Sequence, residues 1–349
     1  MSMTSRERVL AAYNHLEVDR TPIWCGMSNE FQEKAKRELG LDDEQLRLRF
    51  GDDFRWVHAD YTGPQIPFSH PEVHTRTVFG IERKGIGYGH GISIPLKDST
   101  FDDVENYAWP DPTWMDVSRL RGAIAQWDGQ YATMGGEWSP FWHDVIDLMG
   151  MEDMYILMYE EPDLVHAVFG KVVDYYHAVN QRIFEEAGDL MDLFFMGNDF
   201  GSQTGALISP DMFRQFIQPH LKRLIDQAHE FGLKAQMHSC GSVSELIPCF
   251  IEAGLDGLHA LQPDCRDMNA ADLKKDFGDR LVLNGGIDSH HALICGTPED
   301  VKKETSRVLG IMTPRGGYIA GASHDTILEE TPVENVLMMC NFIQQFTQI

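Results

Sequence analysis

Lys234-Ala235-Gln236-Met237-His238-Ser239-Cys240 is a short apolar run that ends in a histidine and a cysteine. Strands of buried sheets are short and apolar, so we interpret Lys234 to Met237 as such a strand. Because a strand points alternate side chains to the same face, His238 and Cys240 can converge on one point at its end. Imidazole and thiolate are ligands that zinc prefers. The stretch therefore predicts both a strand and a zinc site.

Seven further runs of this kind are spread along the chain, which makes eight in all. They cover residues 22–25, 54–58, 131–134, 190–196, 257–261, 281–283 and 318–320. Amphipathic segments of helical length separate most of them. Strands that alternate with helices form parallel βαβ units, and eight such units close into a barrel. The sequence therefore predicts an α/β fold, specifically a (β/α)8 TIM barrel.

Helix boundaries are marked by capping residues and prolines. Thr4 with Glu7, and Thr331 with Glu334, match the capping-box pattern. Pro219 is expected to bend the helix that starts just after Ser209, because proline lacks the N–H that the helix needs.

The stretch from residue 59 to residue 130 is too long for one barrel repeat. It contains the glycine-rich segment 85–91 and the aromatic segment 109–114. We expect an insertion near one mouth of the barrel, with some β structure, that covers this mouth. The glycine-rich segment lacks the strand-then-helix context of a phosphate loop, so a flexible or hairpin loop is the better interpretation. No linker interrupts the chain, and residues 1–349 are predicted to form a single domain.

Composition narrows the choice of partners and compartment. The formal charge of −25 argues against nucleic acid and anionic membranes, since both require a basic face. No apolar stretch approaches the roughly 20 residues of a membrane span, and residues 1–13 lack an apolar signal core. The six cysteines contain no CxxC pair and are expected to be thiols. We therefore expect a cytoplasmic protein.

The active site of such a barrel is built from residues at the C-terminal ends of its strands. His238 and Cys240 supply two zinc ligands, and a catalytic zinc takes a third from the protein. We expect this third ligand to be His324, after the last run, because that strand shares the same mouth. Glu137, Asp199 and His259 are weaker candidates.

Other polar and aromatic side chains lie at the same ends. A proton donor is expected among Asp60, His143 and Asp199. The predicted substrate-binding residues are Trp24, Met27, Trp138, Trp142, Gln203 and Asn284. Trp138 and Trp142 fit core packing equally well, because pocket and core aromatics look alike in sequence. Asp288 is more simply explained as a helix cap.

Several stretches, taken in chain order, resemble the uroporphyrinogen decarboxylase superfamily. They are Asn198-Asp199-Phe200-Gly201-Ser202-Gln203, His238-Ser239-Cys240-Gly241, Asn284-Gly285-Gly286-Ile287-Asp288 and Ser323-His324-Asp325. The resemblance extends over nearly the whole chain. It implies a (β/α)8 barrel with the site in its C-terminal mouth.

The superfamily contains decarboxylases and corrinoid-dependent methyltransferases. Decarboxylases carry an Arg-Gln-Ala-Gly-Arg-type stretch after the first strand, whereas residues 23–29 read Ile-Trp-Cys-Gly-Met-Ser-Asn and lack the arginines that clamp carboxylates. Asp60 and His324 still match the decarboxylase aspartate and histidine. Methyltransferases that act on coenzyme M hold zinc with a His-x-Cys pair and a later cysteine. His238 and Cys240 match the pair, and His324 stands near the place of the missing cysteine.

The resemblance therefore implies the methyltransferase branch. Within this branch, the motif Ser323-His324-Asp325 is more similar to that of enzymes that demethylate methoxylated compounds. We expect a zinc-dependent enzyme that moves a methyl group between a methoxylated compound or a thiol and a corrinoid carried by a partner protein. Two alternatives stay open. One is a cofactor-independent decarboxylase, which requires a cationic pocket, and the other is a non-catalytic ligand-binding barrel with an occluded mouth.

Overall fold

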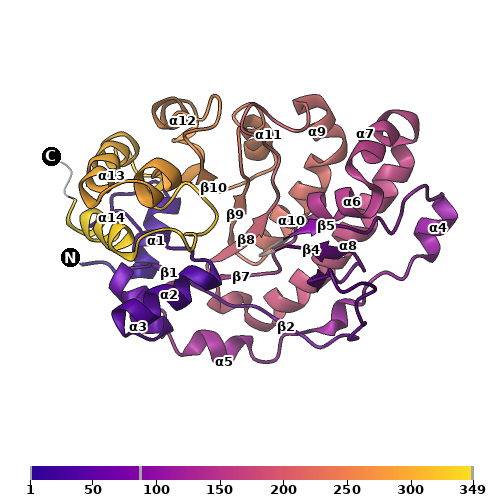
Figure 1. Cartoon of the computed structure of the whole chain (residues 1–349), viewed down its shortest axis with the longest axis horizontal. Coiled ribbons are helices and arrows are strands. Elements are labelled where there is room, and N and C mark those ends of the chain that lie inside the picture. Colours follow the sequence, from indigo (N-terminus) through magenta and orange to yellow (C-terminus); the bar gives the residue numbers. More distant parts are fainter. Residues whose placement is uncertain (1, 86–88, 347–349) are drawn as a thin grey trace.

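The structure is a computed structural model, and it describes residues 2–85 and 89–346. Seven parallel strands form one curled sheet in the order β1-β7-β8-β9-β10-β11-β12 (Figure 1). Their bounds are β1 (Phe54–Trp56), β7 (Ala132–Gly135), β8 (Leu193–Gly197), β9 (Lys234–His238), β10 (Gly257–Leu261), β11 (Val282–Gly285) and β12 (Tyr318–Ile319). Each strand overlaps one of the predicted runs, so the predicted α/β class is confirmed.

The remaining predicted run, residues 22–25, lies between the two edges of this sheet. Ile23 forms a parallel bridge with Ala320, just after β12, and the Trp24 N–H donates to the Ala320 carbonyl at 2.9 Å. On the other side, the Asp53 N–H donates to the Ile23 carbonyl at 3.0 Å. All eight predicted runs therefore take part in the barrel, and the predicted TIM barrel is confirmed.

Helices follow the strands and surround the sheet (Figure 1). They are α1 (Ser5–Tyr13), α2 (Asn29–Leu39), α3 (Asp43–Phe50), α6 (Phe141–Met149), α7 (Met151–Glu160), α8 (Pro162–Ala187), α9 (Pro210–Phe216), α10 (Gln218–Glu230), α11 (Ile247–Glu252), α12 (Ala270–Phe277), α13 (Pro298–Met312) and α14 (Val333–Gln345), with short turns η2 (Gly188–Leu190) and η3 (Ser289–Ile294). Neighbours in the ring contact one another, for example α8 and α10, α12 and α13, and α14 and α3.

Most of the observed helix boundaries agree with those predicted from the capping residues and prolines. Thr4 caps α1 in the predicted capping box, and Pro219 is the second residue of α10, just after the break at Ile217 that separates α9 from α10. The capping box predicted at Thr331 is wrong. Helix α14 begins one residue later, and its N-cap is Pro332, whose side chain cannot accept a hydrogen bond. Thr331 is instead buried just outside the helix.

The long insertion forms two small antiparallel sheets and short helices. They are β2 (Asp60–Tyr61) with β6 (Met115–Asp116), and β3 (Thr75–Arg76), β4 (Glu82–Lys84) and β5 (His90–Gly91), followed by α4 (Phe101–Asn106), η1 (Pro112–Trp114) and α5 (Leu120–Ala125). The predicted β structure is therefore present. The glycine-rich segment joins the hairpin β4–β5, but its residues 86–88 lie outside the described residues.

The described part of the insertion packs on the flank of the barrel, beside α6 and α8 (Figure 1). Arg83 of β4 forms ion pairs with Asp144 and Asp147 of α6, at 3.3 and 2.9 Å. Phe79 packs edge-on against Tyr175 of α8, with ring centroids 5.3 Å apart. The insertion begins after β1, at the mouth end of this strand, and its contacts with α6 and α8 fix it against the helical layer.

Two further sequence expectations concern cysteines and membrane spans. The six cysteines are free thiols in the structure. Among the helices within residues 2–85 and 89–346, none has the length and apolar content needed to cross a bilayer.

A buried carboxylate holds the barrel seam together. The side chain of Asp53 is fully buried and accepts the Ile23 N–H at 2.7 Å. It also forms ion pairs with Arg8 of α1 and with Arg20, both at 2.8 Å. One side chain therefore links the closing segment, the sheet and the first helix.

Replacing this carboxylate is expected to weaken the fold. Asp53→Ala deprives the buried Arg8 of one of its carboxylate partners, and the loss of one partner of a buried pair costs about 3–5 kcal/mol. Chemical denaturation measures the free energy of unfolding. The matched control is Asp189→Ala, which removes an exposed ion pair with Arg121 and is expected to cost less than about 1 kcal/mol. Equal losses in the two variants would contradict this role of Asp53.

Candidate metal centre

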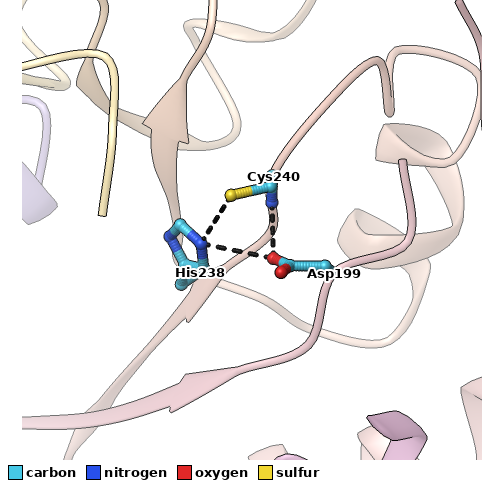
Figure 2. A group of neighbouring side chains, drawn as sticks. All are labelled: Asp199, His238 and Cys240. Atoms are coloured by element: carbon cyan, nitrogen blue, oxygen red, sulfur yellow. Dashed lines mark hydrogen bonds and ion pairs between the residues drawn. The ribbon is translucent and has the colours of Figure 1, made fainter. Parts of the chain in front are cut away.

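Three donor atoms from two neighbouring strand ends converge at the mouth of the barrel (Figure 2). His238 is the last residue of β9, and its Nε2 lies 3.1 Å from the Cys240 Sγ. The same Nε2 lies 3.2 Å from the Oδ1 of Asp199, which follows β8. This oxygen also accepts the backbone N–H of Cys240 at 2.8 Å. The structure thus brings His238 and Cys240 together, as their spacing implies, and adds Asp199 to them.

Two glycines let the loops after β8 and β9 approach closely enough for this contact. A Cβ on Gly201 would lie 2.7 Å from the Cys240 carbonyl oxygen, and a Cβ on Gly241 would lie 2.5 Å from the backbone of Gly201. Gly241 also has a φ of +83°, which disfavours any other residue. The backbone contact between the two loops therefore holds Asp199 against Cys240.

The other edge of the His238 ring faces a second histidine. Its Nδ1 lies 3.1 Å from the Nδ1 of His259, which is its register partner on β10. Asp325 is farther away, with its Oδ1 3.8 Å from the same nitrogen. The ring of Trp138 stacks over His238, with centroids 6.0 Å apart. His238 is therefore enclosed on both edges and on one face.

The local charges favour an ion pair within the cluster. Burial alone would lower the pKa of His238, but Asp325, the Cys240 thiol and the hydrogen bond to Asp199 hold that pKa well above its usual value. Burial would raise the pKa of Asp199, but His238 and His143 hold it well below its usual value. Burial raises the pKa of the Cys240 thiol. A cation that binds here therefore displaces protons from the cluster.

The donor set fits a zinc ion. Zinc accepts imidazole nitrogen, thiolate sulfur and carboxylate oxygen, and in catalytic sites three protein ligands leave one coordination position open. The ligand atoms of Asp199, His238 and Cys240 all lie within 4.8 Å of one another. These three residues could hold the metal, with Asp199 in the place for which the sequence favoured His324.

His324 is not among the residues whose ligand atoms group with His238 in the described part of the chain. Its Nδ1 contacts the Thr326 carbonyl at 3.0 Å, and its ring lines a separate cavity of about 310 Å³ with Gln203 and Gln262. Asp325, the next residue, is the one close to His238. The chain bends at residues 323–326, and this bend brings the Asp325 carboxylate, and not the His324 ring, within 4 Å of His238. Among the described residues, neither His324 nor Glu137 belongs to a group that includes His238.

The three predicted proton donors do not lie together. His143 Nε2 accepts the Asp199 N–H at 3.0 Å and lies 3.6 Å from the Asp199 Oδ2, so these two form one unit. Burial lowers the pKa of His143, although Asp199 opposes this shift. Asp60 is exposed on β2, in the insertion, and lies 3.7 Å from Arg119. Among the described residues, Asp60 is not one of those whose ligand atoms group with His238 or Asp199.

A cavity of about 380 Å³ lies beside the cluster, at the same mouth. Its apolar wall is made of Trp24, Met27, Phe54, Trp56, Met134 and Trp138. Asp325 also lines it, so the cavity reaches to the edge of His238. A Cβ on Gly197 would fall 1.8 Å from the Trp138 ring, so glycine leaves the space that this ring occupies. Trp24, Met27 and Trp138 thus lie where the sequence analysis expected them.

Three other predicted pocket residues lie elsewhere. Trp142 is fully buried against Phe169 and Phe200, so it is a core residue and does not line the pocket. Asn284 is buried inside the barrel, where its Nδ2 donates to the Gln236 Oε1 at 3.1 Å. Gln203 lines the cavity of His324 and not the aromatic one. Asp288 caps η3, as predicted, by accepting the His291 N–H.

The sequence analysis did not identify Phe54, Trp56 and Met134 as pocket residues. The signal was present, because Phe54 and Trp56 are two apart on one strand and therefore point to the same side. Such a pair in a barrel strand faces either the interior or the helices, and only the barrel geometry decides between them.

Comparison with known proteins reveals relatives of both chemistries. The uroporphyrinogen decarboxylase (URO-D) family profile matches residues 86–346. The chain is 32% identical over 130 residues to the methylcobamide:CoM methyltransferase MtaA of Methanosarcina barkeri, a match that covers 37% of this chain and 35% of the relative. It is 24% identical over 245 residues to the methylated-thiol–coenzyme M methyltransferase of Methanosarcina mazei, with 67% and 62% covered. It is 23% identical over 373 residues to a uroporphyrinogen decarboxylase of Alkalilimnicola ehrlichii, with 99% and 96% covered.

The matches to the two methyltransferases span less than two thirds of the length of these relatives. Among solved structures, a methyltransferase from Methanosarcina mazei superimposes with a TM-score of 0.69 at 18% identity, and the alignment covers 99% of both chains. At this identity the likeness shows a shared fold.

The carboxyl of Glu137 makes stability depend on pH. Burial raises its pKa from the ordinary 4.5 to about 7, so the folded chain holds this proton more tightly than the unfolded chain. The contribution of this proton to the free energy of unfolding is fully present below pH 4.5, and it is lost as the pH rises through about 7. Glu137→Gln is therefore expected to be more stable than the wild type at pH 8, by up to about 3 kcal/mol, and similar to it at pH 4. Denaturation at both pH values tests this, with the exposed Glu152→Gln as the control. A Glu137→Gln variant with the same pH dependence as the wild type would contradict it.

Proposed function

This chain belongs to the uroporphyrinogen decarboxylase family, and from that premise we propose that it is a zinc-dependent methyltransferase. It moves a methyl group between a small substrate, which is a methoxylated compound or a thiol, and a corrinoid carried by a partner protein in the cytoplasm. The observation that carries the proposal is the convergence of Asp199, His238 and Cys240 beside an aromatic cavity. The two methyltransferase relatives support it.

Each residue of the cluster has a distinct part in this proposal. His238, Cys240 and Asp199 hold the zinc, which supplies a Lewis acid that polarises an ether oxygen or keeps a thiol deprotonated. With Asp199 as a ligand, His143 is left as the acid–base group, since its ring contacts the Asp199 backbone N–H and lies 3.6 Å from the Asp199 carboxylate.

The aromatic cavity favours a methoxylated substrate over an aliphatic thiol. Trp24, Trp56 and Trp138 offer ring faces on which a flat group can stack.

A decarboxylase is the second candidate, because the family profile and the relative from Alkalilimnicola ehrlichii carry that name. A substrate with several carboxylates requires arginines or lysines in the cavity. Among the described residues that line it, Arg47 is the one such residue, and Asp52 pairs with it at 2.8 Å. The cavity therefore offers a neutralised guanidinium, which suits an uncharged substrate better than a polyanion. A ligand-binding barrel without catalysis predicts an occluded mouth, and the cavity of about 380 Å³ argues against it.

Loss of a cluster ligand is expected to remove the metal. Cys240→Ser and His238→Ala should reduce zinc from about one equivalent per chain to a small fraction, because two protein ligands hold zinc far more weakly than three. Metal analysis after dialysis measures the zinc content. Cys295→Ser, which changes an exposed thiol, is the matched control and should keep its zinc. Unchanged zinc in the cluster variants would refute the metal assignment.

Methyl transfer can be followed directly with the zinc-loaded chain. In the presence of cob(I)alamin, we expect methylcobalamin to form from a methoxyaromatic compound in a panel of methoxylated compounds and thiols. Trp138→Ala should raise KM about 10-fold, because an aromatic contact contributes roughly 1.5 kcal/mol. Trp114→Ala, on the insertion, serves as the control. Release of carbon dioxide from uroporphyrinogen without any methyl transfer would instead establish the decarboxylase.

A further inference from the structure

His259 is a fully buried histidine for which the proposed reaction has no direct use. It sits on β10 as the register partner of His238 on β9, and both rings point into the barrel. The two Nδ1 atoms are 3.1 Å apart, which is a hydrogen-bond distance. The pair therefore shares one proton between two imidazole rings.

The direction of this hydrogen bond follows from the cluster on the other edge of His238. Its Nε2 is close to both the Cys240 thiol and the Asp199 carboxylate. A ring nitrogen that binds a metal carries no proton, so the proton of His238 resides on Nδ1 and is donated. Nδ1 of His259 must then accept it, and the proton of His259 lies on its own Nε2.

We propose that His259 is a positioning residue, which accepts the Nδ1 proton of His238 and thereby presents the His238 Nε2 to the metal. This inference rests on the proposed metal centre. Metal-binding histidines usually donate their second N–H to a carboxylate or a carbonyl, and this partner fixes the ring orientation and the tautomer. Here an uncharged imidazole takes that role, because the carboxylate of Asp325 is too far away at 3.8 Å.

The surroundings of His259 hold its ring in place. Trp24 and Phe195 pack against it in edge-to-face contacts, with centroids 5.2 and 5.5 Å away. Its Nε2 has no hydrogen-bond partner among residues 2–85 and 89–346. These ring contacts restrict rotation of the imidazole, so its Nδ1 stays directed at His238.

A competing arrangement would place the metal on the Nδ1 edge instead. The ligand atoms of His238, His259 and Asp325 also lie within 4.8 Å of one another. In that arrangement His259 is a ligand itself, and Cys240 is not. The two arrangements predict different results for the same variants.

Zinc affinity of the full chain, measured by competition with a chromophoric chelator, is the first test. His259→Phe should weaken zinc binding about 10- to 100-fold while one equivalent still binds at saturation. His259→Asn, whose amide oxygen can replace the accepting Nδ1, should recover most of the affinity. The matched control is His220→Phe on α10, a histidine that stacks on Phe169 away from the cluster.

The second test observes the tautomer in the wild-type chain, which keeps the proposal testable if His259→Phe fails to fold. In zinc-loaded protein with 15N-labelled histidine, the Nδ1 of His238 and the Nε2 of His259 should carry protons. A proton on the Nδ1 of His259 would overturn the proposal.

The remaining outcomes separate this inference from the proposed function. Wild-type affinity in His259→Phe overturns the positioning role and leaves the zinc centre intact. Loss of saturable zinc in both the Phe and the Asn variants, with Cys240→Ser still binding, identifies His259 as a ligand and overturns the proposal. A wild-type chain that binds no zinc overturns the proposed metal centre together with this inference.

Discussion

The closure of the sheet is the constraint on which the rest of this protein depends. Residues 22–25 form no long strand, yet they bridge β12 and β1, and the buried Asp53 carboxylate holds them there. A closed parallel barrel gathers the C-terminal ends of all its strands around one mouth. Without this closure, Trp24 and Met27 would not face Trp138 across the aromatic cavity.

The order of the strands then determines which side chains meet. β8, β9 and β10 are neighbours, so Asp199, which follows β8, lies next to His238 on β9, and His238 lies next to His259 on β10. The close backbone contact at Gly201 and Gly241 brings the loops after β8 and β9 together. The site therefore depends on the order of the strands and on these two glycines. Its polar atoms lie beside a cavity with aromatic walls.

The contact between His238 and Cys240 was predictable because it is local. Their spacing of two residues, at the end of an apolar run, follows from the geometry of a strand. The choice of His324 as the third ligand relied on strand order alone, which says which segment reaches the mouth but not which side chain turns inward. The structure turns Asp325 toward His238 and places His324 in another cavity. The sequence also did not show which way Trp142 and Asn284 point. Trp142 lies in the helical layer, and Asn284 lies inside the barrel.

The sequence by itself determined the eight segments of the barrel, the fold and the family, because apolar periodicity and short motifs are local properties of the chain. Only the tertiary structure decided that Asp199 joins His238 and Cys240, that Trp56 lines the cavity, and that His259 lies behind His238. These contacts join residues that are far apart in the chain. Their distances depend on how the strands curl and how each loop turns, and no local pattern of residues encodes that geometry.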